Sequence, residues 1–166
     1  MFEKGEMVYY GTAGVCRVGD ICKSPFDKND DRTYYMLEPS DFFAGTVIYA
    51  PAEGGKVLLR PLMTASEANE LIAAMADIPV IEPDNEKHRR DEYRSALRDG
   101  TPISLARLIK TVYERRKKAV KIQKRISETD SEFDKNARRA LAGELAYALG
   151  VSADEAETAI NKALKG

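Results

Sequence analysis

Apolar residues in the first part of the chain show the alternation and the β-branched, aromatic composition that are typical of short strands. These runs occupy residues 7–10, 15–22, 33–37, 46–50 and 57–60. Glycines at both ends of 11–14 predict a turn between the first two runs, and the polar segment 24–32 predicts an exposed hairpin loop. A flat sheet of this size would bury too little surface, so we expect a small, strongly bent antiparallel β-barrel of the SH3 or Tudor type.

The apolar period changes to that of helices from Thr64 onward. Thr64 and Glu67 have the spacing of a capping box, and Pro102 has the position of a first helical residue. Further helices are predicted over about 85–98, 129–149 and 153–164. The helix after Pro102 carries an apolar stripe of Leu105, Leu108, Ile109, Val112 and Tyr113. The sequence therefore predicts an α+β protein of two domains, with the barrel over 1–63 and an all-α helical bundle over 64–166.

The overall composition is that of a globular domain. The chain has 166 residues, of which 43% are apolar and 32% are charged. No apolar run approaches the ~18–20 residues that a membrane span requires, and the charged first residues do not resemble an export signal. Cys16 and Cys22 are too few for a disulfide framework or a structural zinc site. We therefore expect a soluble cytoplasmic protein with no membrane partner.

Basic and acidic residues nearly balance, 26 against 27, but they are unevenly distributed along the chain. Residues 86–139 hold 17 Lys and Arg against 9 Asp and Glu, and within 105–125 nine basic residues accompany Glu114 as the one acid. Such clustering, rather than total charge, creates a local positive potential that attracts an anionic polymer.

The sequence offers little for catalysis. His88 is the one histidine and lies in a charged run, where a solvated helix position is its expected place. Gly54, Gly55 and Lys56 resemble the end of a phosphate-binding loop but lack its spacing and its Ser or Thr, so a tight turn is expected. Without a nucleophile–base pair or a metal-ligand cluster, we expect no enzyme activity, no cofactor and no metal site.

Four segments stand in a characteristic order along the chain. They are MFEKGEMVYYGTAGV at 1–15, the strand 46–51, the basic helix 103–118 and RRALAGELA at 138–146. The first combines an aromatic residue, a strand similar to Gly-Asp/Glu-x-Val-Val-Tyr-Pro and a glycine-containing turn. This order and spacing resemble the CarD/CdnL family of bacterial transcription regulators, and the resemblance covers nearly the whole chain.

The resemblance implies that the barrel, which is shared with transcription-repair coupling factors, binds the β subunit of bacterial RNA polymerase. The implied contacts lie on the strand 46–51 and are Val47, Ile48, Tyr49, Ala50 and Pro51. An edge strand suits this task because a partner strand can complete its unpaired N–H and C=O groups, while alternate side chains select the partner. Tyr49 is the preferred contact, whereas Val47 and Ile48 could instead fill the barrel.

The resemblance also implies that the helical domain contacts promoter DNA near the melted region and stabilises the open complex. The candidate residues are Arg89, Arg90, Arg94, Lys110, Arg115, Arg116, Lys117, Lys118 and Lys121. Lys and Arg bind DNA by releasing the counterions condensed on phosphates, so this contact would be salt-sensitive and largely nonspecific. The alternative is that these side chains form a solvated helix surface.

The chain departs from the family pattern at one position. The family has a tryptophan early in the helical domain, which wedges against the minor groove, and this chain contains no Trp. Glu86 occupies the corresponding position, where its carboxylate would repel phosphate. The nearest aromatic residue is Tyr93, whose ring could replace the tryptophan or belong to the core. The resemblance therefore supports polymerase binding by this chain better than it supports the wedge mechanism.

From these observations we predict a monomeric, non-enzymatic transcription regulator that binds RNA polymerase and promoter DNA and modulates the stability of the open complex. The alternative is an adaptor whose barrel binds another protein and whose basic helices contact RNA or only solvent. Salt dependence separates the two, since DNA binding should fall steeply with salt and require the basic helix.

Overall fold

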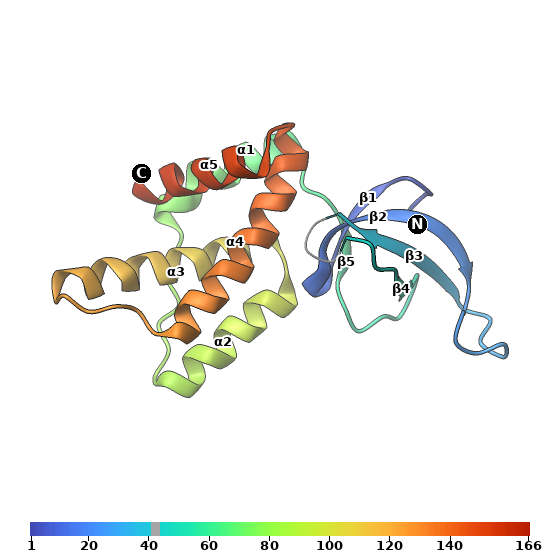
Figure 1. The fold of residues 1–166 in the computed structure, drawn as a ribbon, viewed down its shortest axis with the longest axis horizontal. Coiled ribbons are helices and arrows are strands. Elements are labelled where there is room, and N and C mark those ends of the chain that lie inside the picture. The colour runs from blue at the N-terminus through green and yellow to red at the C-terminus, as the bar shows by residue number, and fades with distance from the viewer. Residues whose placement is uncertain (41–43) are drawn as a thin grey trace. The chain divides into compact units, whose positions relative to one another are not determined.

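A computed structural model describes residues 1–40 and 44–166, which form two compact units (Figure 1). The first unit is Met1–Leu62, and the second is Met63–Gly166. Strands make up the first unit and α-helices the second, in the order that the apolar patterns predict.

In its described part, the first unit contains one antiparallel sheet of five strands in the order β4-β3-β2-β1-β5. The strands are β1 Met7–Tyr10, β2 Gly14–Lys23, β3 Thr33–Pro39, β4 Ile48–Pro51 and β5 Leu59–Pro61. Because β5 pairs with β1, β4 and β5 form the two edges of the sheet. All five predicted runs contain a strand, but the last two strands begin two residues later than predicted, at Ile48 and Leu59.

One face of the sheet carries the apolar core of the first unit. Its buried side chains are Val8, Cys16, Val18, Tyr35, Leu37 and Ala50. Residues opposite each other on neighbouring strands point to the same face. Val18 lies opposite Leu37 in this way, and Tyr35 lies opposite Ala50. Burial raises the pKa of the Cys16 thiol to about 12, so this cysteine remains a neutral, apolar core residue.

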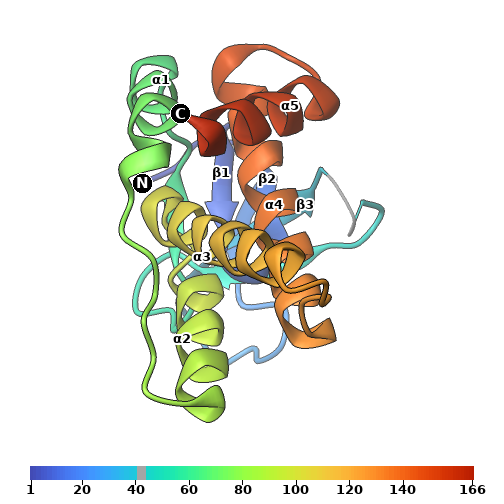
Figure 2. The same ribbon diagram turned by 90° about the vertical axis from the view of Figure 1, so that its left-hand side faces the viewer.

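The second unit is a helical bundle. Its helices are α1 Ala65–Ala74, α2 Glu86–Asp99, α3 Pro102–Lys121, α4 Glu128–Leu149 and α5 Ala153–Lys165, with a 3-10 turn, η2, at Met75–Asp77. Helix α3 packs against α2 and α4, and α5 packs against α4 and α1. In Figures 1 and 2, α1 and α5 lie together at one end of α4, while α2 lies near the other end.

Capping side chains explain where the helices begin. The hydroxyl of Thr64 accepts a hydrogen bond from the Glu67 N–H at 3.1 Å, and the Glu67 carboxylate accepts one from the Thr64 N–H at 2.9 Å. The predicted capping box is therefore confirmed. The predicted start of α4 at 129 is wrong, because Ser127 caps this helix by accepting from the Asp130 N–H at 3.1 Å.

The predicted apolar stripe lines the helical core. Fully buried residues include Leu105, Leu108, Ile109 and Val112 of α3, Leu141 and Leu145 of α4, and Ile160 of α5. Tyr93 of α2 is also fully buried, and its ring lies 5.3 Å from that of Phe133, so the core alternative for Tyr93 is confirmed. The buried Glu144 of α4 accepts a hydrogen bond from the Met63 N–H at 3.2 Å, which attaches the start of the unit to α4.

Candidate functional site

Strand β4 leaves one side of its backbone open at the edge of the sheet. Ile48 and Ala50 point toward the core: Ala50 is fully buried, and Ile48 packs partly against the same cluster. Because side chains alternate along a strand, Tyr49 and Pro51 point to the opposite face. Val47 precedes the strand and is exposed. The alternative in which these residues fill the barrel therefore holds for Ile48 but not for Val47.

Next to the outer face of β4 lies the loop between β2 and β3, which presents an aromatic side chain. Phe26 is 75% exposed, yet its ring packs edge-on against two tyrosines. The ring centroids are 5.7 Å apart for Phe26 and Tyr49, and 6.4 Å apart for Phe26 and Tyr34. Edge-to-face contacts at these distances are favourable. Phe26 and Tyr49 therefore form one continuous aromatic surface beside the open edge.

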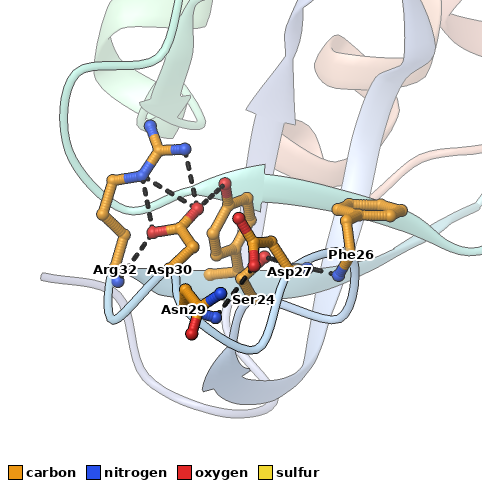
Figure 3. A network of polar contacts seen from close by, with 7 residues as sticks. Ser24, Phe26, Asp27, Asn29, Asp30 and Arg32 are labelled. Carbon is orange, nitrogen blue, oxygen red and sulfur yellow. Dashed lines mark hydrogen bonds and ion pairs between the residues drawn. The ribbon is translucent and has the colours of Figure 1, made fainter.

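An ion pair orders the C-terminal end of this loop, just before β3 (Figure 3). The Asp30 carboxylate accepts hydrogen bonds from Arg32 Nε at 2.9 Å, from Arg32 Nη2 at 2.7 Å and from the Tyr34 hydroxyl at 3.0 Å. The hydrogen bonds from Arg32 hold the pKa of Asp30 well below its usual range. The bidentate contact between Asp30 and Arg32 lies within the loop. The Tyr34 hydroxyl, which belongs to β3, ties the loop to this strand on the same tyrosine that Phe26 contacts.

Hydrogen bonds between side-chain oxygens and backbone N–H groups order the N-terminal part of the loop. The Ser24 hydroxyl accepts from the N–H groups of Phe26 and Asp27, each at 3.3 Å, and the Asp27 carboxylate accepts from the Asn29 N–H at 2.8 Å (Figure 3). Sequence reasoning predicted this loop but did not select Phe26. The available signal was the presence of one large apolar residue in an otherwise polar, turn-forming segment.

In the helical unit, several of the predicted DNA-contacting residues take part in internal ion pairs. Arg89 is buried, with its Nε 3.1 Å from Asp130 Oδ1, and it also forms two short hydrogen bonds with Glu86. Arg115 Nε lies 2.9 Å from the other oxygen of Asp130. Burial raises the pKa of Asp130, but the hydrogen bond from Arg115 and the charges of Arg115 and Arg89 outweigh it and lower the pKa overall.

Lys110 and Arg116 are also engaged with other groups. Lys110 is buried and donates to the Ala76 carbonyl at 2.6 Å. Arg116 Nη1 lies 3.8 Å from the Asp134 carboxylate, although its side chain is exposed. Burial raises the pKa of Asp134 despite its cationic neighbours. Arg89 and Lys110 are therefore placed to hold helices together, whereas Arg116 keeps a surface position.

The remaining cations are exposed. Arg94 and Lys117 have only short-range partners, Asp91 at 3.6 Å and Glu114 at 3.6 Å. Across residues 1–40 and 44–166, no carboxylate lies within ion-pair distance of the following exposed cations: Arg90, Lys118, Lys121, Lys124 and Arg125. The predicted set stopped at Lys121, although the same basic run continues to Lys124 and Arg125.

Glu86, which the sequence analysis predicted to stand at the family's tryptophan position, is the first residue of α2. Its exposed carboxylate is bound to Arg89, and hydrogen bonds from that guanidinium lower the pKa of Glu86. A carboxylate in the first turn of a helix is also stabilised by the helix dipole. Glu86 therefore has a local structural role at this position.

The architecture defines a class of protein: an α+β chain with a small antiparallel sheet that has β4 at one edge, followed by a helical unit with surface cations. Residues 2–63 match a family model described as the CarD-like/TRCF RID domain, and residues 70–161 match the CarD C-terminal domain. The chain belongs to the CarD family, and the predicted family and fold class are confirmed. A search of curated proteins found no match to the chain.

The family assignment fixes the general role of the protein. It is a transcription-related regulator that interacts with RNA polymerase, and CarD domains are regulatory and non-catalytic. Among the described residues, no group of three or more His, Cys, Asp or Glu side chains is placed to hold a metal ion. In the same part of the chain, no helix combines the length and apolar character needed to cross a membrane.

Proposed function

We propose that this protein binds the β subunit of bacterial RNA polymerase through strand β4 and contacts promoter DNA through the exposed cations of its helical unit. In this way it modulates the stability of the open promoter complex. The observation that carries the proposal is the edge position of β4, with Tyr49 on its outer face, in a chain whose two units both match CarD domains.

The backbone of β4 supports the polymerase contact. One side of β4 is paired with β3, from Ile48 opposite Leu37 to Pro51 opposite Tyr34. The other side can accept a strand from a partner, and backbone hydrogen bonds of this kind supply affinity. Tyr49 supplies selectivity, because large aromatic side chains on a rigid support are typical centres of protein interfaces.

The distribution of buried and exposed cations supports the DNA contact. We assign phosphate contacts to the exposed members of the predicted set, which are Arg90, Arg94, Arg116, Lys117, Lys118 and Lys121. Arg115 is only half-buried but is bound to the buried Asp130, so it is left out of this assignment. We assign Arg89 and Lys110 a positioning role, because both are buried and bonded within the bundle. A buried cation releases few counterions from DNA, whereas an exposed one adds to both affinity and salt dependence.

The test is binding of the purified protein to a fragment of the β-subunit lobe of RNA polymerase from its own host. We expect Tyr49→Glu to abolish binding, because it places a charge in the centre of the contact, and Tyr49→Phe to retain most of it. Val57→Glu is the matched control, since Val57 is an exposed apolar residue beside the opposite edge strand. Failure of the intact, folded protein to bind the lobe would contradict the proposal and favour an adaptor for another protein.

A further inference from the structure

The two edges of the sheet differ in their protection against pairing with another chain. Strand β5 is only three residues long and contains Arg60 and Pro61, and a charge and a proline are typical protections of an edge strand. Strand β4 contains no charged residue, and the whole segment 44–52 around it is uncharged. Pro51, at the end of β4, limits pairing only there. The edge at β4 is therefore the one that favours the addition of a strand.

The ladder between β3 and β4 shows which backbone groups of β4 point away from the sheet. The Ala52 N–H donates to the Thr33 carbonyl at 2.8 Å, and the same register continues back through Ala50. In an antiparallel ladder every second residue bonds to the neighbouring strand. Ala50 and Ala52 therefore bond to β3, whereas the N–H and C=O of Tyr49 and the C=O of Pro51 point to the free side.

The groups on the free side are complementary to those of a second copy of the same strand. We align two copies of β4 antiparallel, with Tyr49 opposite Tyr49. Each Tyr49 N–H then donates to the other Tyr49 carbonyl, and the N–H of Val47, just before β4, donates to the Pro51 carbonyl of the second copy. Pro51 has no N–H, so no donor of this segment stays unpaired. The same register places Glu53 opposite Gly45, so no like charges meet.

The aromatic side chains of both copies gather on one face in this arrangement. The two-fold axis is perpendicular to the sheet, so the two outer faces stay on the same side. The two Tyr49 side chains become cross-strand neighbours, and the Phe26 ring, 5.7 Å from Tyr49 in each copy, extends the contact. Val47 is 50% exposed and lies opposite Pro51 of the second copy on this face. Pairing therefore also covers an apolar side chain that the single chain leaves in solvent.

We propose that two copies of this protein pair through β4 into a symmetric, reversible dimer, and that this dimer blocks the edge against RNA polymerase. One strand of four residues from each copy makes a contact smaller than the ~1,200–2,000 Å² of stable interfaces, so the dimer dissociates readily. The prediction of a monomer then holds for dilute protein. The blocking of polymerase rests on the proposed function, because both partners use the free backbone groups of Tyr49, whereas the dimer itself does not depend on it.

Sedimentation velocity over a concentration series tests whether the dimer forms. Val47→Lys places a charge in the paired segment. Val57→Lys is the matched control, because Val47 and Val57 are exposed valines that precede the two opposite edge strands. Melting temperatures establish that both variants fold. We expect the sedimentation coefficients of the wild type and of Val57→Lys to rise with concentration. Val47→Lys should weaken the dimer about tenfold, because the symmetric contact carries the change twice.

Disulfide formation tests the register of the pairing. The background is Cys22→Ser, since Cys22 is partly accessible and Cys16 is buried. Tyr49→Cys places two thiols opposite each other, at the ~5.5 Å Cα separation of a hydrogen-bonded pair, which a disulfide can span. Val47→Cys is the control, because residue 47 faces residue 51 of the second copy and lies roughly 13 Å from the other residue 47. Mild oxidation should link Tyr49→Cys into dimers and leave Val47→Cys unlinked.

Addition of the β-subunit lobe fragment tests whether the dimer blocks polymerase binding. We expect the lobe to convert the dimer into a complex that contains one copy of the protein. We also expect the apparent affinity for the lobe to fall as the protein concentration rises, because a larger fraction of the β4 edges is then paired.

Four results would overturn this proposal in different ways. A sedimentation coefficient that stays constant up to the solubility limit would exclude the dimer and leave the proposed polymerase contact intact. Equal disulfide formation by Tyr49→Cys and Val47→Cys would place the contact between copies elsewhere. A lobe that binds the dimer without dissociating it would show that the two partners use different surfaces. A dimer with the expected register, together with a lobe that does not bind at all, would contradict the proposed function instead.

Discussion

The guanidinium of Arg89 and the carboxylate of Asp130 form a buried ion pair, with 3.1 Å between Nε and Oδ1, across 41 positions of sequence. The two side chains are 5% and 1% exposed. Arg115 binds the second carboxylate oxygen of Asp130 at 2.9 Å, so this one carboxylate joins α2, α3 and α4. The basic segment of the chain therefore supplies internal ion pairs as well as surface charge.

Asp130→Asn should destabilise the helical unit strongly. The change removes the buried countercharge of Arg89 and leaves it only the exposed Glu86, and removing one partner of a buried ion pair typically costs about 3–5 kcal/mol. Urea denaturation followed by circular dichroism measures this loss. Asp91→Asn is the control, because the pair of Asp91 with Arg94 is exposed and its loss should change the unfolding free energy by less than about 0.5 kcal/mol. Equal effects of the two changes would contradict the assignment.

Stability should also fall in acid because of Asp130. Its pKa is lower in the folded protein than in the unfolded chain, so the folded state favours the ionised carboxylate. This contribution is present above the unfolded pKa of about 4 and is lost as the pH falls through the lower, folded pKa. The pKa of Asp134 is raised, so its contribution has the opposite sign and is lost as the pH rises.

The difference between wild type and Asp130→Asn isolates the Asp130 contribution, since Asp134 is present in both proteins. We expect this difference in unfolding free energy to be constant near neutral pH and to shrink below about pH 4. Denaturation curves collected across that range provide the measurement. A difference that stays constant down to strongly acidic pH would show that Asp130 has no shifted pKa.

The two cysteines should differ sharply in reactivity. Thiolate is the reactive form, and Cys16 is fully buried with a pKa of about 12, whereas Cys22 is partly accessible. At mildly alkaline pH a thiol reagent should label Cys22 rapidly in the folded protein and reach Cys16 only in denaturant. Mass spectrometry of the labelled peptides distinguishes the two. Rapid labelling of Cys16 in the native protein would contradict the burial of this strand.

Phe26 should contribute to polymerase binding together with Tyr49. Its ring extends the outer face of β4. Hydrogen bonds already order the loop that carries it, so binding costs little further conformational entropy. We expect Phe26→Ala to weaken binding to the β-subunit lobe about tenfold. Lys28→Ala, in the same loop, is the control and should bind as wild type does. If Phe26→Ala binds normally while Tyr49→Glu does not, the interface ends at β4.

Local sequence signals predicted the helices and strands because each signal acts over a few residues. Thr64 and Glu67 are three positions apart, and their capping box forms as expected. The start of α4 was misplaced because 127 and 129 both carry a hydroxyl that can cap a helix. Local signals do not give the order of the strands, so they could not show that β4 lies at an edge. That position depends on β5 crossing the sheet to pair with β1.

The candidate site was harder to predict because it depends on contacts between distant segments. Sequence reasoning counted Arg89 among the DNA contacts, but its burial depends on Asp130 in another helix. Phe26 was read only as part of a polar loop, since its packing against Tyr49 joins two segments through the sheet. Charge alone also could not separate buried cations such as Arg89 and Lys110 from exposed ones such as Lys118 and Lys121.

The pairing of β1 with β5 gives the first unit the properties of a portable module. Val8 lies opposite Pro61, so the chain enters and leaves the sheet on neighbouring antiparallel strands at the same end. A unit with adjacent ends can be inserted into a longer polypeptide at one point without interrupting any of its strand pairs. The matching domain description names CarD-like and TRCF proteins together, as expected of a sheet whose ends allow it to be transferred intact between chains.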